Sequence, residues 1–231
     1  MVYVSKVHGL TVNTVRTGKG AISSMRMDTV ETWIRSTADG IQTRHVVHDW
    51  YVYPERCKPM LSHRVPDGTT DDIKLVMKYL ASYVDGIFHP TQFIVTGVSL
   101  GGHITWNMLA EEPSIAGAII IVGSPNLTDM LVERLGYASL SDIPQNTKEW
   151  PRSIERLYRE RDQALEKIVG KKILILNGAL DTLVPSKFTD PWVAKYAHKN
   201  DVKFIVQEDC GHVLSFRMME EVVEWVAQIL V

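Results

Sequence analysis

The chain has 231 residues, 45% of them hydrophobic and 23% charged, and its formal net charge is −2 at pH 7. This length suits one large α/β core, and the sequence has no basic tract that would bind nucleic acid or an anionic membrane surface. It has no apolar run near the roughly 18 residues of a spanning helix, no signal-peptide core at its start and only two cysteines, Cys57 and Cys210, so we expect a cytoplasmic protein without a disulfide framework.

The first part of the chain alternates apolar and polar residues, a pattern typical of strands. Strands are predicted at Val2–Val4, Leu10–Val15, Ala21–Met25 and Arg44–Val52. Asp28 and Thr29 are good helix caps, so a short helix is predicted over Val30–Ser36. A longer helix is predicted to begin at the caps and carboxylates of Thr69–Asp72. Apolar residues then continue at helical spacing to Val84.

The second part of the chain alternates short apolar runs with amphipathic segments. The apolar runs are predicted as buried strands at Phe93–Val95, Ala118–Val122, Lys172–Leu176 and Lys203–Val206. The amphipathic segments are predicted as helices at Gly102–Leu109, Ile154–Ile168 and Met218–Leu230. Strands that alternate with helices predict a mostly parallel, doubly wound α/β sheet flanked by helices. We expect residues 1–231 to form a single domain.

A sharp glycine-rich turn follows the strand at Phe93–Val95. It reads Gly97-Val98-Ser99-Leu100-Gly101 and opens the next predicted helix. A strand–turn–helix of this kind exposes a serine hydroxyl above the sheet, and the helix N-terminus adds a positive dipole and free N–H groups. The alternative is a glycine-rich turn in which Ser99 only caps the helix.

An activated serine needs a base, and the base needs an orienting acid. Asp181 and His212 each follow a predicted buried strand by a few residues, where functional loops gather in parallel sheets. Asp181 could instead serve an Asx turn, and His212 could cap the last helix. Asp129 is the alternative acid. His103, four residues after Ser99, is expected to pack or to lie on the helix surface rather than to catalyse.

These motifs resemble those of the α/β-hydrolases, and the resemblance covers nearly the whole chain. Gly97–Gly101 resembles the nucleophile elbow, Gly178–Pro185 resembles the acid loop, and Gly211-His212 resembles the histidine loop. The segment Asp67–Pro125 is similar to fungal serine hydrolases and esterases. The resemblance implies Ser99 as nucleophile, His212 as base and Asp181 as acid.

One feature departs from the pattern of that superfamily. Members usually carry a His-Gly pair after the third strand, in a loop that donates the second oxyanion N–H, and this chain has none between Ala21 and Asp28. The backbone N–H of Leu100 is still expected to donate. Met27 is our expectation for the second donor.

Residues 124–150 fit no simple strand–helix unit. Leu127, Met130, Leu131 and Leu135 stand at helical spacing, which predicts one short amphipathic helix. We expect this segment to form a small lid over Ser99, with apolar residues that face the pocket.

The sequence therefore predicts a serine hydrolase that cleaves a carboxylic ester or related acyl bond of a small molecule. No spacing of His and Cys favours a metal and no nucleotide-binding motif occurs, so no cofactor is expected. Two alternatives stay open: hydrolysis of a thioester or C–C bond, and a binder or receptor with little turnover, which the missing His-Gly pair favours.

Overall fold

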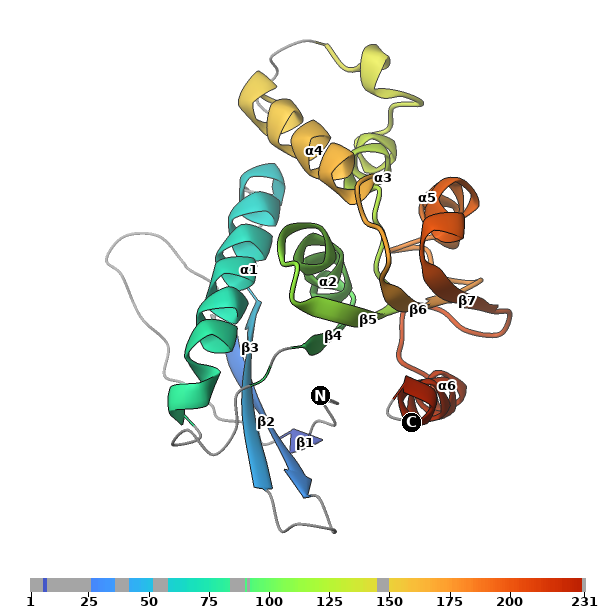
Figure 1. Cartoon of the computed structure of the whole chain (residues 1–231). Helices are drawn as coiled ribbons and strands as arrows, with labels where there is room; N and C mark the ends of the chain where they lie inside the picture. The colour runs from blue at the N-terminus through green and yellow to red at the C-terminus, as the bar shows by residue number, and fades with distance from the viewer. Residues whose placement is uncertain are drawn as a thin grey trace. The chain divides into compact units, whose positions relative to one another are not determined.

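The computed structural model describes residues 6–7, 26–35, 42–51, 58–83, 90, 92–144 and 150–229. The chain divides into two compact units, Met1–Thr91 and Gln92–Val231 (Figure 1). That the whole chain is one domain stays a prediction.

The first unit holds an antiparallel sheet and one long helix. The sheet has the order β1-β2-β3, with β1 at Lys6–Val7, β2 at Arg26–Arg35 and β3 at Gln42–Tyr51. Strands β2 and β3 pair along their whole length, from Arg26 opposite Tyr51 to Arg35 opposite Gln42. The helix α1 runs over Lys58–Tyr83.

Two predictions for the first unit are wrong. Residues 30–35 belong to strand β2, not to a helix, because β-branched and aromatic residues such as Val30, Trp33 and Ile34 favour a strand once a ten-residue partner is available. Helix α1 begins at Lys58, eleven residues before Thr69. Pro59 is tolerated there because its missing N–H has no partner in the first helical turn.

The predicted strand near Arg44–Val52 is confirmed as β3. The predicted strands at Val2–Val4, Leu10–Val15 and Ala21–Met25 lie outside the described residues.

The second unit confirms the predicted parallel sheet. Its strands are β4 at Phe93–Val98, β5 at Ile115–Ile121, β6 at Lys172–Gly178 and β7 at Asp201–Gln207. They pair in parallel in the order β4-β5-β6-β7. The helices of this unit are α2 at Leu100–Glu111, α3 at Leu127–Arg134, α4 at Arg152–Leu165, α5 at Asp190–Tyr196 and α6 at Phe216–Ile229. Short 3₁₀ turns lie at Leu140–Asp142, Ser186–Phe188 and Ala197–Lys199.

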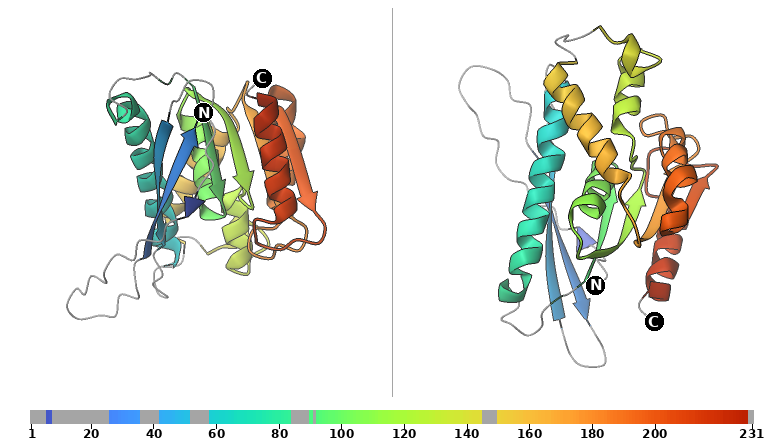
Figure 2. Two further views of the ribbon diagram at one scale, coloured as in Figure 1. Left: turned by 90° about the horizontal axis from the view of Figure 1, so that it is seen from below. Right: turned by 45° about the horizontal axis from the view of Figure 1, so that its top comes forward.

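Helices cover both faces of this sheet (Figure 2). On one face, Trp106 of α2 meets Trp192 of α5 edge to face, with ring centroids 4.5 Å apart. On the other face, α6 packs through Trp225 against a core that includes Leu174 and Leu176 of β6. Burial on both sides explains why the central strands β5 and β6 are continuously apolar rather than alternating.

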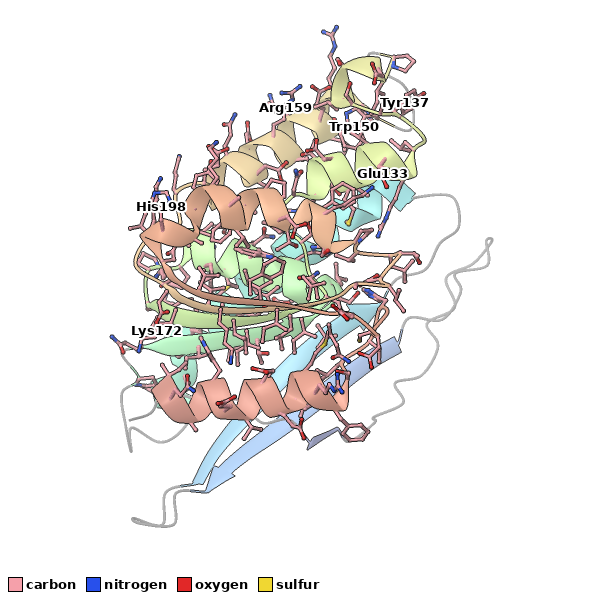
Figure 3. All side chains as sticks on the ribbon, turned by 90° about the vertical axis from the view of Figure 1, so that its right-hand side faces the viewer. Glu133, Tyr137, Trp150, Arg159, Lys172 and His198 are labelled. Carbon is pink, nitrogen blue, oxygen red and sulfur yellow. The ribbon has the colours of Figure 1, made fainter. Side chains whose placement is uncertain are left out.

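The segment after β5 forms a second core with α4. The predicted amphipathic helix is confirmed as α3, and its Met130 is buried with Leu127 among residues of α4. Trp150 stacks on Tyr158 with ring centroids 5.7 Å apart. Figure 3 shows Glu133 of α3 and Lys172, where β6 begins, toward opposite ends of the sheet, so α3 lies at the end where β6 finishes.

Candidate active site

The turn between β4 and α2 holds Ser99 in a strained backbone conformation. Its φ is 56° and its ψ is −114°, a region that non-glycine residues seldom adopt and that often marks a functional position. Gly97 makes the turn possible, since a Cβ there would lie 2.0 Å from the carbonyl oxygen of Gly101. A Cβ on Gly101 would meet no described atom within 4 Å, so the turn requires only the first of the two flanking glycines.

The Ser99 hydroxyl does not cap the helix that it precedes. Ser99 occupies the N-cap position of α2, yet its side chain makes no capping bond to the described residues of that helix. Its Oγ lies 2.7 Å from Nε2 of His212. The geometry is therefore that of a serine paired with a base, and not that of the capping serine that the sequence left open.

The opposite edge of the His212 ring faces Asp181. His212 Nδ1 lies 2.8 Å from Oδ2 of Asp181, whose side chain is buried. The other carboxylate oxygen, Oδ1, accepts from the backbone N–H groups of Leu183 and Val184, both at 2.8 Å. The Asp181 carboxylate thus stabilises the turn that contains it and also orients the His212 ring. This contact favours the tautomer with a proton on Nδ1, so that Nε2 can accept a proton.

The order of the strands brings these three residues together. Ser99 follows β4, Asp181 follows β6 and His212 follows β7, and parallel strands end at one edge of a sheet. The acid and histidine loops are joined directly, because the Leu180 N–H donates to the Cys210 carbonyl at 2.9 Å.

Leu100 begins α2 directly after Ser99. The first N–H groups of a helix have no intrahelical acceptor, so this N–H is available to a developing negative charge. Met27 lies in β2 opposite Trp50, in the first unit. Its part in an oxyanion hole stays a prediction.

Asp129, the alternative acid, bonds elsewhere. Its carboxylate accepts from the Asn126 side-chain amide at 2.7 Å, and its backbone N–H is capped by the same residue at 3.1 Å. These bonds fix the first turn of α3. The structure thus brings Asp181, and not Asp129, to the ring of His212.

His103 is a buried packing residue, which is one of the two non-catalytic places that the sequence left open. Its Nδ1 lies 2.9 Å from the Ser124 carbonyl oxygen and 3.1 Å from the Ser124 backbone nitrogen. Burial lowers the pKa of His103 to about 4, against the hydrogen bond to Ser124, which acts in the opposite direction. The ring is therefore neutral at pH 7 and ties α2 to the end of β5.

Helix α3 is linked to the acid loop, and to the 3₁₀ turn that follows it, by polar contacts that the sequence did not predict. Arg134 donates from Nη2 to the Leu183 carbonyl. Lys187 forms an ion pair with Glu133 at 2.6 Å. Both links cross about fifty residues of sequence, and no local pattern signals such a pairing.

In the described part of the chain, no three His, Cys, Asp or Glu side chains converge so as to hold a metal ion. Among those same residues, no helix is both long and apolar enough to cross a bilayer.

A parallel sheet with helices on both faces, and a strained serine turn between strand and helix, define an α/β-hydrolase fold. The chain belongs to the prolyl oligopeptidase family, whose sequence pattern matches residues 58–231. This is a family of hydrolases.

Individual relatives are more distant. Over 151 residues the chain is 24% identical to the Bacillus subtilis protein named "Putative esterase YitV", a match that covers 61% of this chain and 58% of that protein. The chain thus spans somewhat more than half the length of this relative.

Solved structures share the fold at low identity. The esterase Pf2001 of Pyrococcus furiosus is 14% identical, with a TM-score of 0.53 over 98% of this chain and 90% of that one. A puromycin hydrolase is 16% identical, with a TM-score of 0.59 over 97% of this chain and 38% of that one. Likeness at these identities shows the fold alone.

Proposed function

We propose that this protein is a serine hydrolase that cleaves a carboxylic ester or related acyl bond through Ser99, His212 and Asp181. The observation that carries the proposal is the continuous chain of contacts from Ser99 Oγ to His212 Nε2, at 2.7 Å, and from His212 Nδ1 to the Asp181 carboxylate, at 2.8 Å. Neither a helix-capping turn nor a simple binding pocket requires a serine, a histidine and a buried carboxylate in contact one after another.

Each residue has a distinct task in this proposal. Ser99 Oγ forms a bond to the acyl carbon while its proton passes to His212 Nε2. The buried carboxylate of Asp181 stabilises the imidazolium that results. The Leu100 N–H stabilises the oxyanion. His212 then protonates the leaving group, and water releases the acyl group from Ser99.

The small-molecule ester is favoured over other acyl bonds by the esterase names of the relatives described above. A peptide amide is the second candidate, and membership of the prolyl oligopeptidase family favours it. Parallel assays with p-nitrophenyl acetate and prolyl-p-nitroanilide separate the two.

We also propose that residues 124–150 cover the site as a small lid. Two polar links support this role: Arg134 donates to the Leu183 carbonyl, and Ser124 Oγ donates to the Phe188 carbonyl at 3.3 Å. The first link brings the segment to the loop that carries Asp181, and the second brings it to the 3₁₀ turn that follows this loop. Such a cover would exclude water during acyl transfer.

The direct test is hydrolysis of p-nitrophenyl acetate by Ser99→Ala. Ser153→Ala is the matched control, because Ser153 lies exposed on α4. Loss of turnover in the first variant alone supports the proposal. Equal rates in wild type and Ser99→Ala would refute it.

A further inference from the structure

Three large apolar side chains stand exposed beside the proposed catalytic residues. Leu180 precedes Asp181, Leu183 follows it by two residues, and Val213 follows His212; their exposed fractions are 65%, 56% and 54%. Single exposed apolar residues are ordinary, but exposed apolar side chains that gather at one site mark a surface for a ligand or partner. We call these three residues the apolar rim.

The backbone of the apolar rim is fixed by the same bonds that hold the proposed acid and base. The Leu180 N–H donates to the Cys210 carbonyl at 2.9 Å, and the Val213 N–H donates to the Gly211 carbonyl at 3.0 Å. The Leu183 N–H donates to Asp181 Oδ1 at 2.8 Å. The rim therefore keeps its place relative to Asp181 and His212, and a group held against it is held relative to the reacting atoms.

The proposed chemistry decides which part of the substrate meets the rim. When Ser99 Oγ bonds to the acyl carbon, the bond from that carbon to the alcohol oxygen must break, and this oxygen takes its proton from His212 Nε2. The alcohol portion of the ester therefore leaves beside His212. Leu180 and Leu183 lie within two residues of Asp181, and Val213 follows His212 directly, so the backbone of all three lies beside this exit.

The apolar character of the rim selects the leaving group, because placing a charge against apolar side chains is costly. The charges near the rim are of both signs and do not by themselves favour either sign of leaving group. Asp209 lies 4.0 Å from Arg217, and the Arg134 guanidinium donates to the Leu183 carbonyl.

From these observations we infer that the apolar rim is a subsite for the alcohol portion of the ester, and that this portion is an uncharged alkyl or aryl group. The inference rests on the proposed serine hydrolase function and adds the chemical class of the leaving group. On this inference, Leu180, Leu183 and Val213 determine the specificity of the enzyme for the alcohol portion of the ester.

Two ester series test this inference. One keeps the acetyl group and lengthens the alcohol from methyl to butyl to hexyl, and the other keeps the methyl alcohol and lengthens the acyl group. We expect kcat/KM of the wild type to rise at least tenfold from methyl to hexyl acetate. Replacing all three rim residues by serine should remove most of that rise, whereas Leu183→Met, which keeps an apolar side chain, should retain it.

The matched control is Val169→Ser, because Val169 is 59% exposed and lies before β6, at the other end of the sheet from the acid loop. It should keep the wild-type preference. A wild-type rate that is flat along the alcohol series, or a preference that survives the triple serine variant, would overturn the subsite while leaving the hydrolase proposal intact. Ester hydrolysis that survives Ser99→Ala would overturn both.

Discussion

Gly178 and Cys210 lie so close that a Cβ on Gly178 would come within 2.3 Å of the Cys210 carbonyl oxygen. Gly178 ends β6, just before the acid loop, and Cys210 lies in the histidine loop. This approach of the two backbones allows the Leu180 N–H to reach the Cys210 carbonyl. It thereby sets the distance between Asp181 and His212.

Gly178→Ala should therefore displace the histidine loop. A backbone carbonyl cannot yield as the end of a side chain can, so we expect a loss of stability on the order of 2 kcal/mol or more, together with a fall in kcat. Gly211→Ala is the control, because the nearest described atom to its new Cβ is the Leu180 carbonyl oxygen at 3.8 Å. Thermal melts and ester turnover of both variants measure the effect, and equal behaviour would contradict it.

The orienting role of Asp181 predicts a large effect on turnover. Asp181→Asn keeps the shape of the side chain but favours the wrong tautomer of His212, so kcat should fall by about 10⁴-fold. Asp129→Asn should leave kcat near that of the wild type, because Asp129 bonds to Asn126. If Asp129→Asn were the slower enzyme, the assignment of the acid would be wrong.

Burial of neutral His103 predicts how stability depends on pH. Its pKa is about 4 in the folded protein, below the ordinary value of 6.5, so between these values the unfolded chain binds a proton that the folded chain does not. Stability should therefore fall as pH falls from 6.5 to 4, by roughly 3 kcal/mol at most.

A substitution isolates this contribution. His103→Asn removes the titrating group, and denaturant melts across that pH range should show a shallower loss of stability than in wild type. His198→Asn is the control, because His198 is exposed. An unchanged pH slope in His103→Asn would argue against a neutral buried ring.

Met130 illustrates what the helical pattern of residues 124–150 could not show. The spacing predicted an apolar side that faces a pocket, but Met130 is 2% exposed, in a core with Trp150 and Tyr158. Met130→Ala should therefore destabilise the protein by about 2–5 kcal/mol. Leu157→Ala, at a position that is 41% exposed on α4, should cost far less; equal losses in thermal melts would count against this core.

The strands and helices of the second unit could be predicted from the sequence, because the patterns that indicate them lie within short segments. Each parallel strand is a short apolar run, and because such strands end at one edge of a sheet, the sequence alone predicts that Ser99, Asp181 and His212 lie close together. Contacts between segments that are distant in the sequence could not be predicted from such patterns. The bond from Arg134 to Leu183 joins α3 to the acid loop, and nothing in either segment specifies its partner.

The secondary structure of the first unit was harder to predict, because residues that favour a helix start lie next to residues that favour a strand. Asp28 and Thr29 favoured a helix start, yet β2 continues through both residues to Arg35. The strand forms because β3 pairs with it along ten residues, a stabilisation that a local pattern does not contain. Strand preference depends on such neighbours more than helix preference does.

The proposed role of Ser99 as a nucleophile activated by His212 can be tested directly with a fluorophosphonate probe. The probe phosphonylates an activated serine with loss of fluoride, and peptide mapping by mass spectrometry identifies the residue that carries it. We expect one stoichiometric label on Ser99, which is lost in Ser99→Ala and strongly slowed in Asp181→Asn. A label on another residue, or undiminished labelling of Ser99→Ala, would contradict it.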